Sequence, residues 1–233
     1  MANILVIGKY YHPYSGGIED NTRQIAEYIA RFHNVTVLAS NHARGNATEH
    51  INDVRVLRKN VQIVIANQPI SLNLFGGLDL SSFDAIHFHS PNPFASAIFC
   101  LRTMFRKPPP LVITHHMDIF GRAFLKAIAK PFMQMMLNRA NAIIVTSEKN
   151  LHISQDLPKN RQYAVVPLGV READYYIDET IRLEASEWRQ SLGKEHRVIG
   201  FLGRHARYKG LDILMHALAK IPNVHALVAG DGP

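Results

Sequence analysis

The sequence predicts an α/β fold built on a doubly wound parallel sheet. Apolar segments and helical segments alternate at least four times along the 233 residues, which is typical of parallel strands covered by helices on both faces. The first strand, residues 4–7, is an unbroken apolar run, as expected of a strand buried on both faces. The alternation starts again near Val198, so we expect a second α/β domain that these residues open and do not complete.

Local patterns predict the individual elements. In the first domain we expect strands at residues 4–7, 34–40, 54–58, 61–66, 84–90, 111–116, 142–147 and 163–170. We expect its helices at residues 18–32, 94–105, 121–138 and from residue 148. A polar segment follows residue 40, and residues 67–82 are expected to form a loop with at most one short helix. The predicted domains are residues 1–170, a linker at 171–197 with a helix at 179–191, and residues 198–233, which contain a strand, a helix at 209–220 and a strand.

Composition and charge narrow the functional classes. No apolar stretch approaches the about 20 residues of a membrane-spanning helix, and nothing at the start resembles a signal peptide, so a cytoplasmic location is expected. Cys100 is the only cysteine, which excludes an intrachain disulfide and a thiolate metal cluster. The net charge of +7 favours an anionic partner such as nucleotide phosphates, a lipid diphosphate or an acidic membrane face. The charge is spread along the chain, which argues against a nucleic-acid groove.

The loop between the first strand and the first helix is the first candidate site. It ends in Gly16 and Gly17, directly before the helical pattern. A strand, a glycine loop and a helix start allow backbone N–H groups to meet an anion. The G-x-G-x-x-G pattern of dinucleotide sites is absent, so we predict a phosphorylated or sugar-like ligand. The alternative for a glycine pair is an ordinary tight turn.

Five motifs occur in an order that resembles a known family. They are P-x-x-G-G-x-E (Pro13, Gly16, Gly17, Glu19), T-H-H-M-D (114–118), V-P-L-G-V (166–170), G-R-x-x-x-x-K-G (203–210) and G-D-G-P (230–233). In this order and strand–helix context they resemble glycosyltransferase family 4, which comprises retaining, nucleotide-sugar-dependent enzymes of the GT-B fold. The resemblance covers essentially the whole chain. It implies a complete Rossmann-like N-terminal domain, a hinge and the start of a second Rossmann-like domain, without the Glu-x-x-x-x-x-x-x-Glu motif of the family's second half.

The resemblance implies a donor site to which both domains contribute. Gly16 and Gly17 would face the donor diphosphate and sugar, with Gly169 also on the donor side. Arg204 and Lys209 would clamp the diphosphate, because fixed cations stabilise the charge on a leaving nucleoside diphosphate without a metal. No cofactor and no protein-bound metal are implied. The alternative for two basic residues is a solvated charged loop.

The T-H-H-M-D motif supplies the expected catalytic residues. The family pattern aligns His116 with the active-site histidine and Asp118 with the acid that follows it. His116 would hydrogen-bond the donor sugar, whereas His115, which points to the opposite face, is expected to be structural. Without the resemblance, a histidine at a strand end is most often a satisfied polar residue.

Glu19, His89 and Glu148 are expected on the acceptor side. His89 shares a strand face with His87 near the carboxyl edge of the sheet. Imidazoles two residues apart can reach one metal ion, but no H-x-x-x-H pattern or carboxylate cluster accompanies them. Glu148 follows a buried strand, and its alternative role is that of a first helical residue beside a Ser147 cap.

Two predicted helices combine basic and aromatic side chains. The residues on or beside them are Arg102, Arg106, Lys107, Arg122, Lys126, Lys130, Phe105, Phe120, Phe124 and Phe132. Such helices can lie on the acidic inner face of a membrane, where family members meet lipid-linked acceptors. A solvated face with an ordinary core stripe is the alternative.

We therefore expect a hexosyltransferase of glycan or surface-polysaccharide synthesis. It would transfer a sugar, with mannose as a candidate by analogy, from a nucleotide sugar to an acceptor hydroxyl with retention of configuration. Because half of the donor site is missing, we expect little or no activity from these residues alone. The alternatives are a non-catalytic acceptor-binding or assembly module and a nucleotide-sugar epimerase of the same fold, which would need no acceptor.

Overall fold

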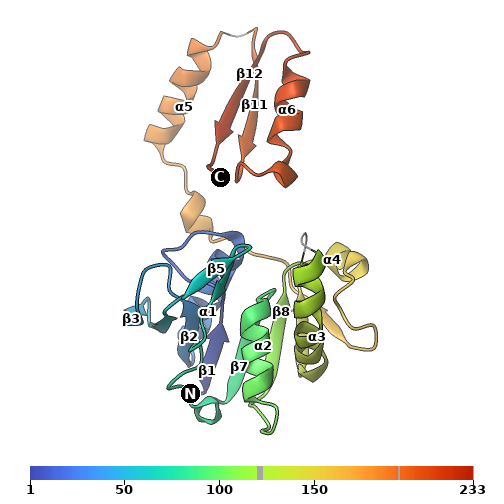
Figure 1. Ribbon diagram of the computed structural model, residues 1–233. Helices are drawn as coiled ribbons and strands as arrows, with labels where there is room; N and C mark the ends of the chain where they lie inside the picture. The colour runs from blue at the N-terminus through green and yellow to red at the C-terminus, as the bar shows by residue number, and fades with distance from the viewer. Residues whose placement is uncertain (120–122, 194, 233) are drawn as a thin grey trace. The chain divides into compact units, whose positions relative to one another are not determined.

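A computed structural model describes residues 1–119, 123–193 and 195–232 (Figure 1). The chain divides into two compact units, Met1–Gly169 and Val170–Pro233. The strands of the first unit are β1 (Asn3–Ile7), β2 (Asn34–Ser40), β3 (Ala47–Ile51), β4 (Val54–Lys59), β5 (Ile63–Ile65), β6 (Gln68–Ile70), β7 (Ala85–Ser90), β8 (Leu111–His115), β9 (Ala142–Val145) and β10 (Tyr163–Val165). Its helices are α1 (Gly17–Ala30), α2 (Pro93–Arg102), α3 (Ala123–Arg139), α4 (Glu148–Ile153) and a short 3₁₀ helix (Leu80–Ser82).

The first unit is organised around an eight-stranded sheet in the order β10-β9-β8-β7-β1-β2-β4-β3. All neighbours are parallel except the β3–β4 pair at one edge. From β1 the chain proceeds outward through β2, and from β7 it proceeds outward in the opposite direction. The strand order therefore reverses between β1 and β7, and ligands of such sheets bind outside the carboxyl ends of the strands at this switch point.

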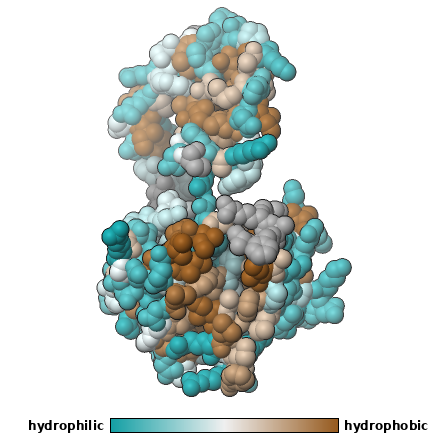
Figure 2. All heavy atoms as spheres, viewed as in Figure 1, coloured by the Kyte–Doolittle hydropathy of each residue, from teal (hydrophilic) through white to brown (hydrophobic). Residues whose placement is uncertain are grey.

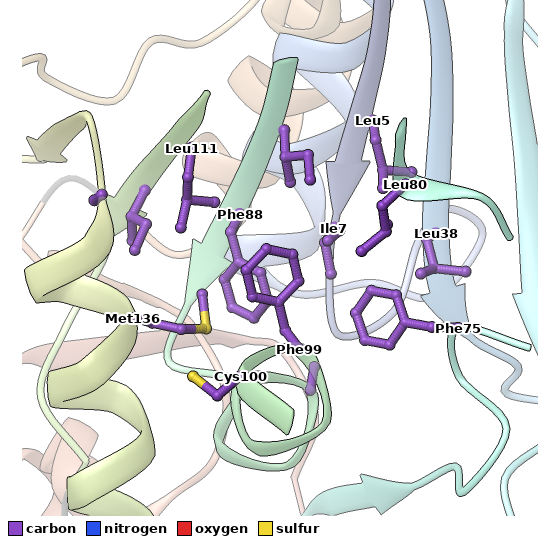
Figure 3. Packing of buried hydrophobic residues seen from close by; sticks show 14 of the residues in the cluster. Leu5, Ile7, Leu38, Phe75, Leu80, Phe88, Phe99, Cys100, Leu111 and Met136 are labelled. Carbon is purple, nitrogen blue, oxygen red and sulfur yellow. The ribbon is translucent and has the colours of Figure 1, made fainter. Parts of the chain in front are cut away.

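The apolar run of β1 contributes to a core on each face of the sheet. Leu5 and Ile7 pack with Phe88 and Phe99 under α2 and α3 (Figure 3). Val6 points the other way and belongs to the cluster that contains Ala26 of α1. Both clusters are formed by buried side chains, which explains why this strand shows no polar alternation.

Two hairpins differ from the sequence expectation. Residues 61–66 were expected to form one strand, but only Ile63–Ile65 are extended, and they pair with β6 in a separate two-stranded sheet. The turn residues Ala66 and Asn67 have φ values of 53° and 60°, as in a type I′ hairpin turn. The polar segment after residue 40 contains β3, which pairs with β4 across a similar turn at Asn52 and Asp53, with φ values of 47° and 64°.

Several expected boundaries shift. Helix α1 ends at Ala30, and Phe32 is 53% exposed. Strand β10 is shorter than expected, because residues 166–170 are not extended in the sheet. Phe120 and Arg122, which were expected on a basic helix, lie outside the described residues, as does the side chain of Phe124. Within the described ranges, no helix has the length and apolar character needed to cross a bilayer.

The second unit contains a two-stranded parallel sheet. Its elements are a 3₁₀ helix (Glu172–Tyr175), α5 (Glu179–Ser191), β11 (Arg197–Leu202), a 3₁₀ helix (Arg207–Lys209), α6 (Leu211–Leu218) and β12 (Val224–Ala229). Strands β11 and β12 pair in parallel along their whole length. Among the described residues of this unit no side chain is fully buried, and Leu202 and Ile213 are 86% and 70% exposed.

Candidate functional site

The ends of β1, β7 and β8 place the expected first-unit residues along one edge of the sheet. Ile7 pairs with Phe88, and Ser90 pairs with His115, so the three strands end at neighbouring positions. The loop that leads to Gly16 follows β1, and His116 follows β8. The sheet therefore brings the glycine loop and the histidines of β7 and β8 to its switch-point edge.

Gly16 makes room for the carboxylate of Glu19. The φ of Gly16 is 173°, which any residue can adopt, but a Cβ at this position would lie 2.3 Å from Glu19 Oε2. Glu19 is only 9% exposed, although it was expected to face the acceptor. Burial raises the pKa of Glu19, and the hydrogen bond from its own backbone N–H and the nearby Lys9 oppose this rise. A carboxylate of the protein itself thus lies at the N-terminus of α1, where a ligand anion was expected.

Gly17 has a different environment from Gly16. A Cβ on Gly17 would meet no atom within 4 Å, and its φ lies outside the left-handed region. Neither packing nor backbone conformation therefore requires a glycine here. The open space above its backbone is compatible with close approach of a ligand.

Arg58 fixes the loop between β1 and α1. This side chain on β4 is 2% exposed, and it donates hydrogen bonds to the carbonyl oxygens of Tyr11 (3.2 Å) and His12. Its Nε and Nη2 also donate to the two carboxylate oxygens of Glu49, at 3.1 and 3.2 Å. The sequence reasoning missed Arg58, and recognition of the Asn52-Asp53 turn would have placed Glu49 and Arg58 on paired strands.

Three histidines form a contiguous cluster near the ends of β7 and β8, in which His87 and His89 are buried and His116 is half-buried. His87 Nε2 lies 2.8 Å from Thr114 Oγ1, and the His87 and His89 ring centroids are 4.6 Å apart. His89 Nδ1 lies 3.0 Å from His116 Nε2, with the two rings nearly parallel at 16°. His89 is 1% exposed, and its Nε2 has no hydrogen-bond partner among the described residues.

Burial keeps these imidazoles neutral near pH 7. It lowers the pKa of His87 and of His116 to about 4, with nearby histidines adding to the effect at His116. The pKa of His89 falls well below its ordinary value for the same reasons. In a neutral pair, one ring nitrogen donates and the other accepts.

The unpartnered nitrogen of His89 selects one tautomer. If His116 donated to His89, the proton of His89 would sit on Nε2 as a buried donor without an acceptor, which is costly. We therefore assign the proton to His89 Nδ1, which donates to His116 Nε2. His116 then carries its own proton on Nδ1.

Both carboxylate oxygens of Asp118 have hydrogen-bond partners within the protein. His115, which is 0% exposed, has its Nε2 3.1 Å from Asp118 Oδ1. The hydroxyl of Ser154 also donates to Oδ1, and the backbone N–H of Gln155 donates to Oδ2 at 2.8 Å. Burial acts to raise the pKa of Asp118, but these hydrogen bonds outweigh it and hold the pKa below its ordinary value. Asp118 therefore ties β8 to the segment after α4.

Asn150 of α4 also holds the end of β8 in place. Its Nδ2 donates to the carbonyl oxygens of His115 and His116, at 3.2 and 3.0 Å. Its backbone N–H donates to the Ser147 hydroxyl, which caps the helix. Glu148 is the first residue of this helix and its side chain is 72% exposed. Sequence reasoning missed Asn150 and Ser154, which no motif marks.

The remaining expected residues are exposed. Gly169 is the last residue of the first unit, and a Cβ added to it would meet no atom within 4 Å. In the second unit Arg204 and Lys209 lie in the segment after β11, with Lys209 Nζ 5.4 Å from the Tyr208 ring centroid. Among the described residues, no group of three or more His, Cys, Asp or Glu side chains is placed to hold a metal ion.

The glycines of the second unit allow two loops to touch. A Cβ on Gly230 would lie 2.0 Å from the carbonyl oxygen of Gly203, and the backbone N–H of His205 donates to the carbonyl of Asp231 at 2.6 Å. The G-R and G-D-G motifs therefore form one backbone-packed corner at the carboxyl ends of β11 and β12.

A family model decides the classification. The model described as Glycosyltransferase Family 4 matches residues 15–174, which include the glycine pair and the histidine cluster. The chain belongs to glycosyltransferase family 4. The match confirms the family to which the five motifs pointed.

Solved structures show the fold of this family 4 chain. Sucrose-phosphate synthase from Thermosynechococcus elongatus matches with a TM-score of 0.67 and 20% identity, over 99% of this chain and 62% of the other. HepE of Anabaena, in complex with UDP-glucose, matches with a TM-score of 0.65 and 20% identity, over 99% and 61%. These likenesses confirm the GT-B fold. The chain spans about three fifths of the length of both structures, and no curated protein matches it.

Proposed function

We propose that this chain is part of a retaining glycosyltransferase that moves a sugar from a nucleotide sugar to an acceptor hydroxyl. The observation that carries the proposal is the switch-point edge, where the open backbone of Gly17 and the histidine cluster follow neighbouring strands. Membership of family 4 supports the reaction class. The UDP-glucose bound to HepE supports a nucleotide-sugar donor. Mannose is one candidate sugar, and a glycan or lipid-linked molecule is the candidate acceptor.

The histidine tautomer gives His116 a defined role in this proposal. With its proton on Nδ1, His116 would donate a hydrogen bond to an oxygen of the donor sugar, and His89 would hold the ring in place. Asp118 would act as a positioning residue through His115, because both of its carboxylate oxygens are engaged. His116, rather than Asp118, would then touch the substrate.

The donor phosphates would meet backbone groups and fixed cations. Gly17 leaves room for close approach of the phosphates. In the second unit, Arg204 and Lys209 would stabilise the charge that develops on the leaving diphosphate without a resident metal or cofactor. The carboxylate of Glu19 fills the space beside Gly16 and repels an anion there, so we propose that Gly16 and Glu19 face sugar hydroxyls rather than the phosphates. Membrane contact through the basic helices stays a prediction.

Nucleotide-sugar binding by the purified chain tests the proposal. We expect saturation-transfer NMR to detect binding of UDP-glucose or GDP-mannose, and Arg204→Gln to weaken it. Arg197→Gln is the matched control, because Arg197 is an exposed cation at the opposite end of β11. We expect little or no sugar transfer. Absence of binding would overturn the proposal, robust transfer would contradict the expected inactivity, and conversion of the sugar without an acceptor would indicate an epimerase.

Gly17→Ala separates ligand contact from folding. The added methyl group meets no protein atom and lies in the first turn of a helix, so the melting temperature should hold or rise slightly. Nucleotide-sugar binding should weaken at least about tenfold, because the Cβ occupies space that the diphosphate needs. Gly200→Ala is the control, since Gly200 is also uncrowded but lies in β11. Unchanged binding in Gly17→Ala would remove the glycine loop from the donor site.

A further inference from the structure

A cavity in the first unit is not explained by the donor site. Its volume is about 560 Å³, and its lining includes Ile65, Ile70, Phe94, Ala97, Ala129 and Phe132. These residues come from the β5–β6 hairpin, from the start of α2 and from α3. Ligand pockets of about 300–1,000 Å³ with mostly apolar walls are typical of sites for small organic molecules.

The cavity lies at the same edge of the sheet as the histidine cluster. Helix α2 begins shortly after β7 ends, and its residues Pro93 and Phe94 contribute to the wall. Ile119, another wall residue, directly follows Asp118. An occupant of the cavity would therefore extend from the edge at which we propose the transfer to take place.

The surface around the cavity is also apolar. Ile63, Val64 and Ile65 of β5 are 54%, 53% and 43% exposed, and Ile128 of α3 is 54% exposed. Figure 2 shows apolar surface on the face formed by β5 and by α2 with α3. A polar sugar does not need such surroundings, and burying a charged diphosphate among apolar side chains is costly. The cavity therefore does not suit the nucleotide sugar.

The polar groups among the described wall residues offer no free charge to a ligand. Gln68 contributes to the wall, and its buried Oε1 has no hydrogen-bond partner among the described residues. Lys126 Nζ lies 3.4 Å from Asp156 Oδ1, so its charge is already balanced. The described part of the wall therefore presents no unbalanced charge, which suits an uncharged occupant.

We propose that the cavity binds the apolar portion of the acceptor. The acceptor would be amphiphilic: an uncharged hydrocarbon group occupies the cavity, and the hydroxyl-bearing part projects toward His116. That the occupant is the acceptor rests on the proposed function, whereas binding of the hydrocarbon group can be measured without any transfer.

Alkyl glucosides of increasing length test this proposal. Methyl, butyl, hexyl and octyl β-D-glucoside are titrated into the 233-residue chain by calorimetry, below their critical micelle concentrations and without a nucleotide sugar. We expect each methylene that enters the cavity to strengthen binding by up to about fourfold. An affinity that does not depend on chain length would overturn the proposal.

Two substitutions on α3 identify the binding site. Ala129→Phe fills the cavity and should abolish the dependence on chain length, whereas Ala127→Phe adds the same side chain at an exposed position outside the wall and should preserve it. If Ala129→Phe does not fold, Ala97→Leu on α2 takes its place. Equal losses in the Ala127 and Ala129 variants would indicate adsorption to the surface and would also overturn the proposal. Failure to bind nucleotide sugars, with chain-length dependence intact, would count against the proposed function alone.

Discussion

Acidification from pH 6.5 toward pH 4 is expected to unfold the first unit. The pKa of His87 and of His116 is about 4 in the folded chain, against about 6.5 in the unfolded chain. Between these values the unfolded state binds more protons, so stability is fully present above pH 6.5 and is lost as the pH falls. By pH 4, each of the two histidines lowers the free energy of unfolding by about 3 kcal/mol. This is a large part of the about 5–15 kcal/mol that stabilises a typical domain.

Urea unfolding followed by far-UV circular dichroism across this pH range measures the effect. His87→Gln retains a partner for Thr114 and should make stability less dependent on pH, by about 3 kcal/mol over the window. His50→Gln, at an exposed position of β3, should leave the dependence unchanged. Asp118 acts outside this window, because its lowered pKa makes its contribution disappear only at more acidic pH. Stability that stays constant from pH 7 to pH 4.5 would contradict the buried neutral state of the cluster.

Arg58→Met is expected to lower the free energy of unfolding by about 2–5 kcal/mol. The carbonyl oxygens of Tyr11 and His12 lose their charged donor, and each buried acceptor left unsatisfied costs about 1–3 kcal/mol. The carboxylate side chain of Glu49 is 42% exposed, so water solvates it and its loss of a partner adds little. The loop before Gly16 also loses its anchor, so nucleotide-sugar binding should weaken.

Arg55→Met supplies the control for this substitution. Arg55 lies on the same strand, but it is exposed, so its replacement should change the free energy of unfolding by less than about 0.5 kcal/mol. Arg58→Lys should give an intermediate value, because an ammonium group cannot reproduce the forked donor geometry. If Arg55→Met and Arg58→Met are equally stable, the loop is not held by Arg58.

The interior of the fold could be predicted from sequence, whereas its edges could not. Strands buried on both faces, such as β1, show continuous apolar runs that few other structures produce. The edge strand β3 alternates half-buried and more exposed residues, so only the turn at Asn52 and Asp53 marks it. The apolar residues of β5 resemble a buried strand, but all three are exposed. Their partner is a local hairpin strand, and hydropathy alone does not distinguish these cases.

In the candidate site, too, contacts within one strand could be predicted from sequence, whereas contacts between distant segments could not. The spacing of His87 and His89 predicts that they share a strand face, and their rings are neighbours. The hydrogen bond between His89 and His116 joins residues that are 27 positions apart, and it depends on the register of β7 against β8. The burial of Glu19 at the start of α1 depends on packing around a loop, which sequence periodicity does not describe.

Because the second unit is loosely packed, calorimetry and tryptophan fluorescence should report on different parts of the chain. With both strands of its small sheet at an edge and without fully buried side chains among its described residues, this unit should contribute little to a cooperative melting transition. A calorimetric melting temperature of the chain then describes the first unit. Trp188, the only tryptophan, lies in α5 and is 41% exposed. Its fluorescence therefore gives a local reading of the unit that contains Arg204 and Lys209.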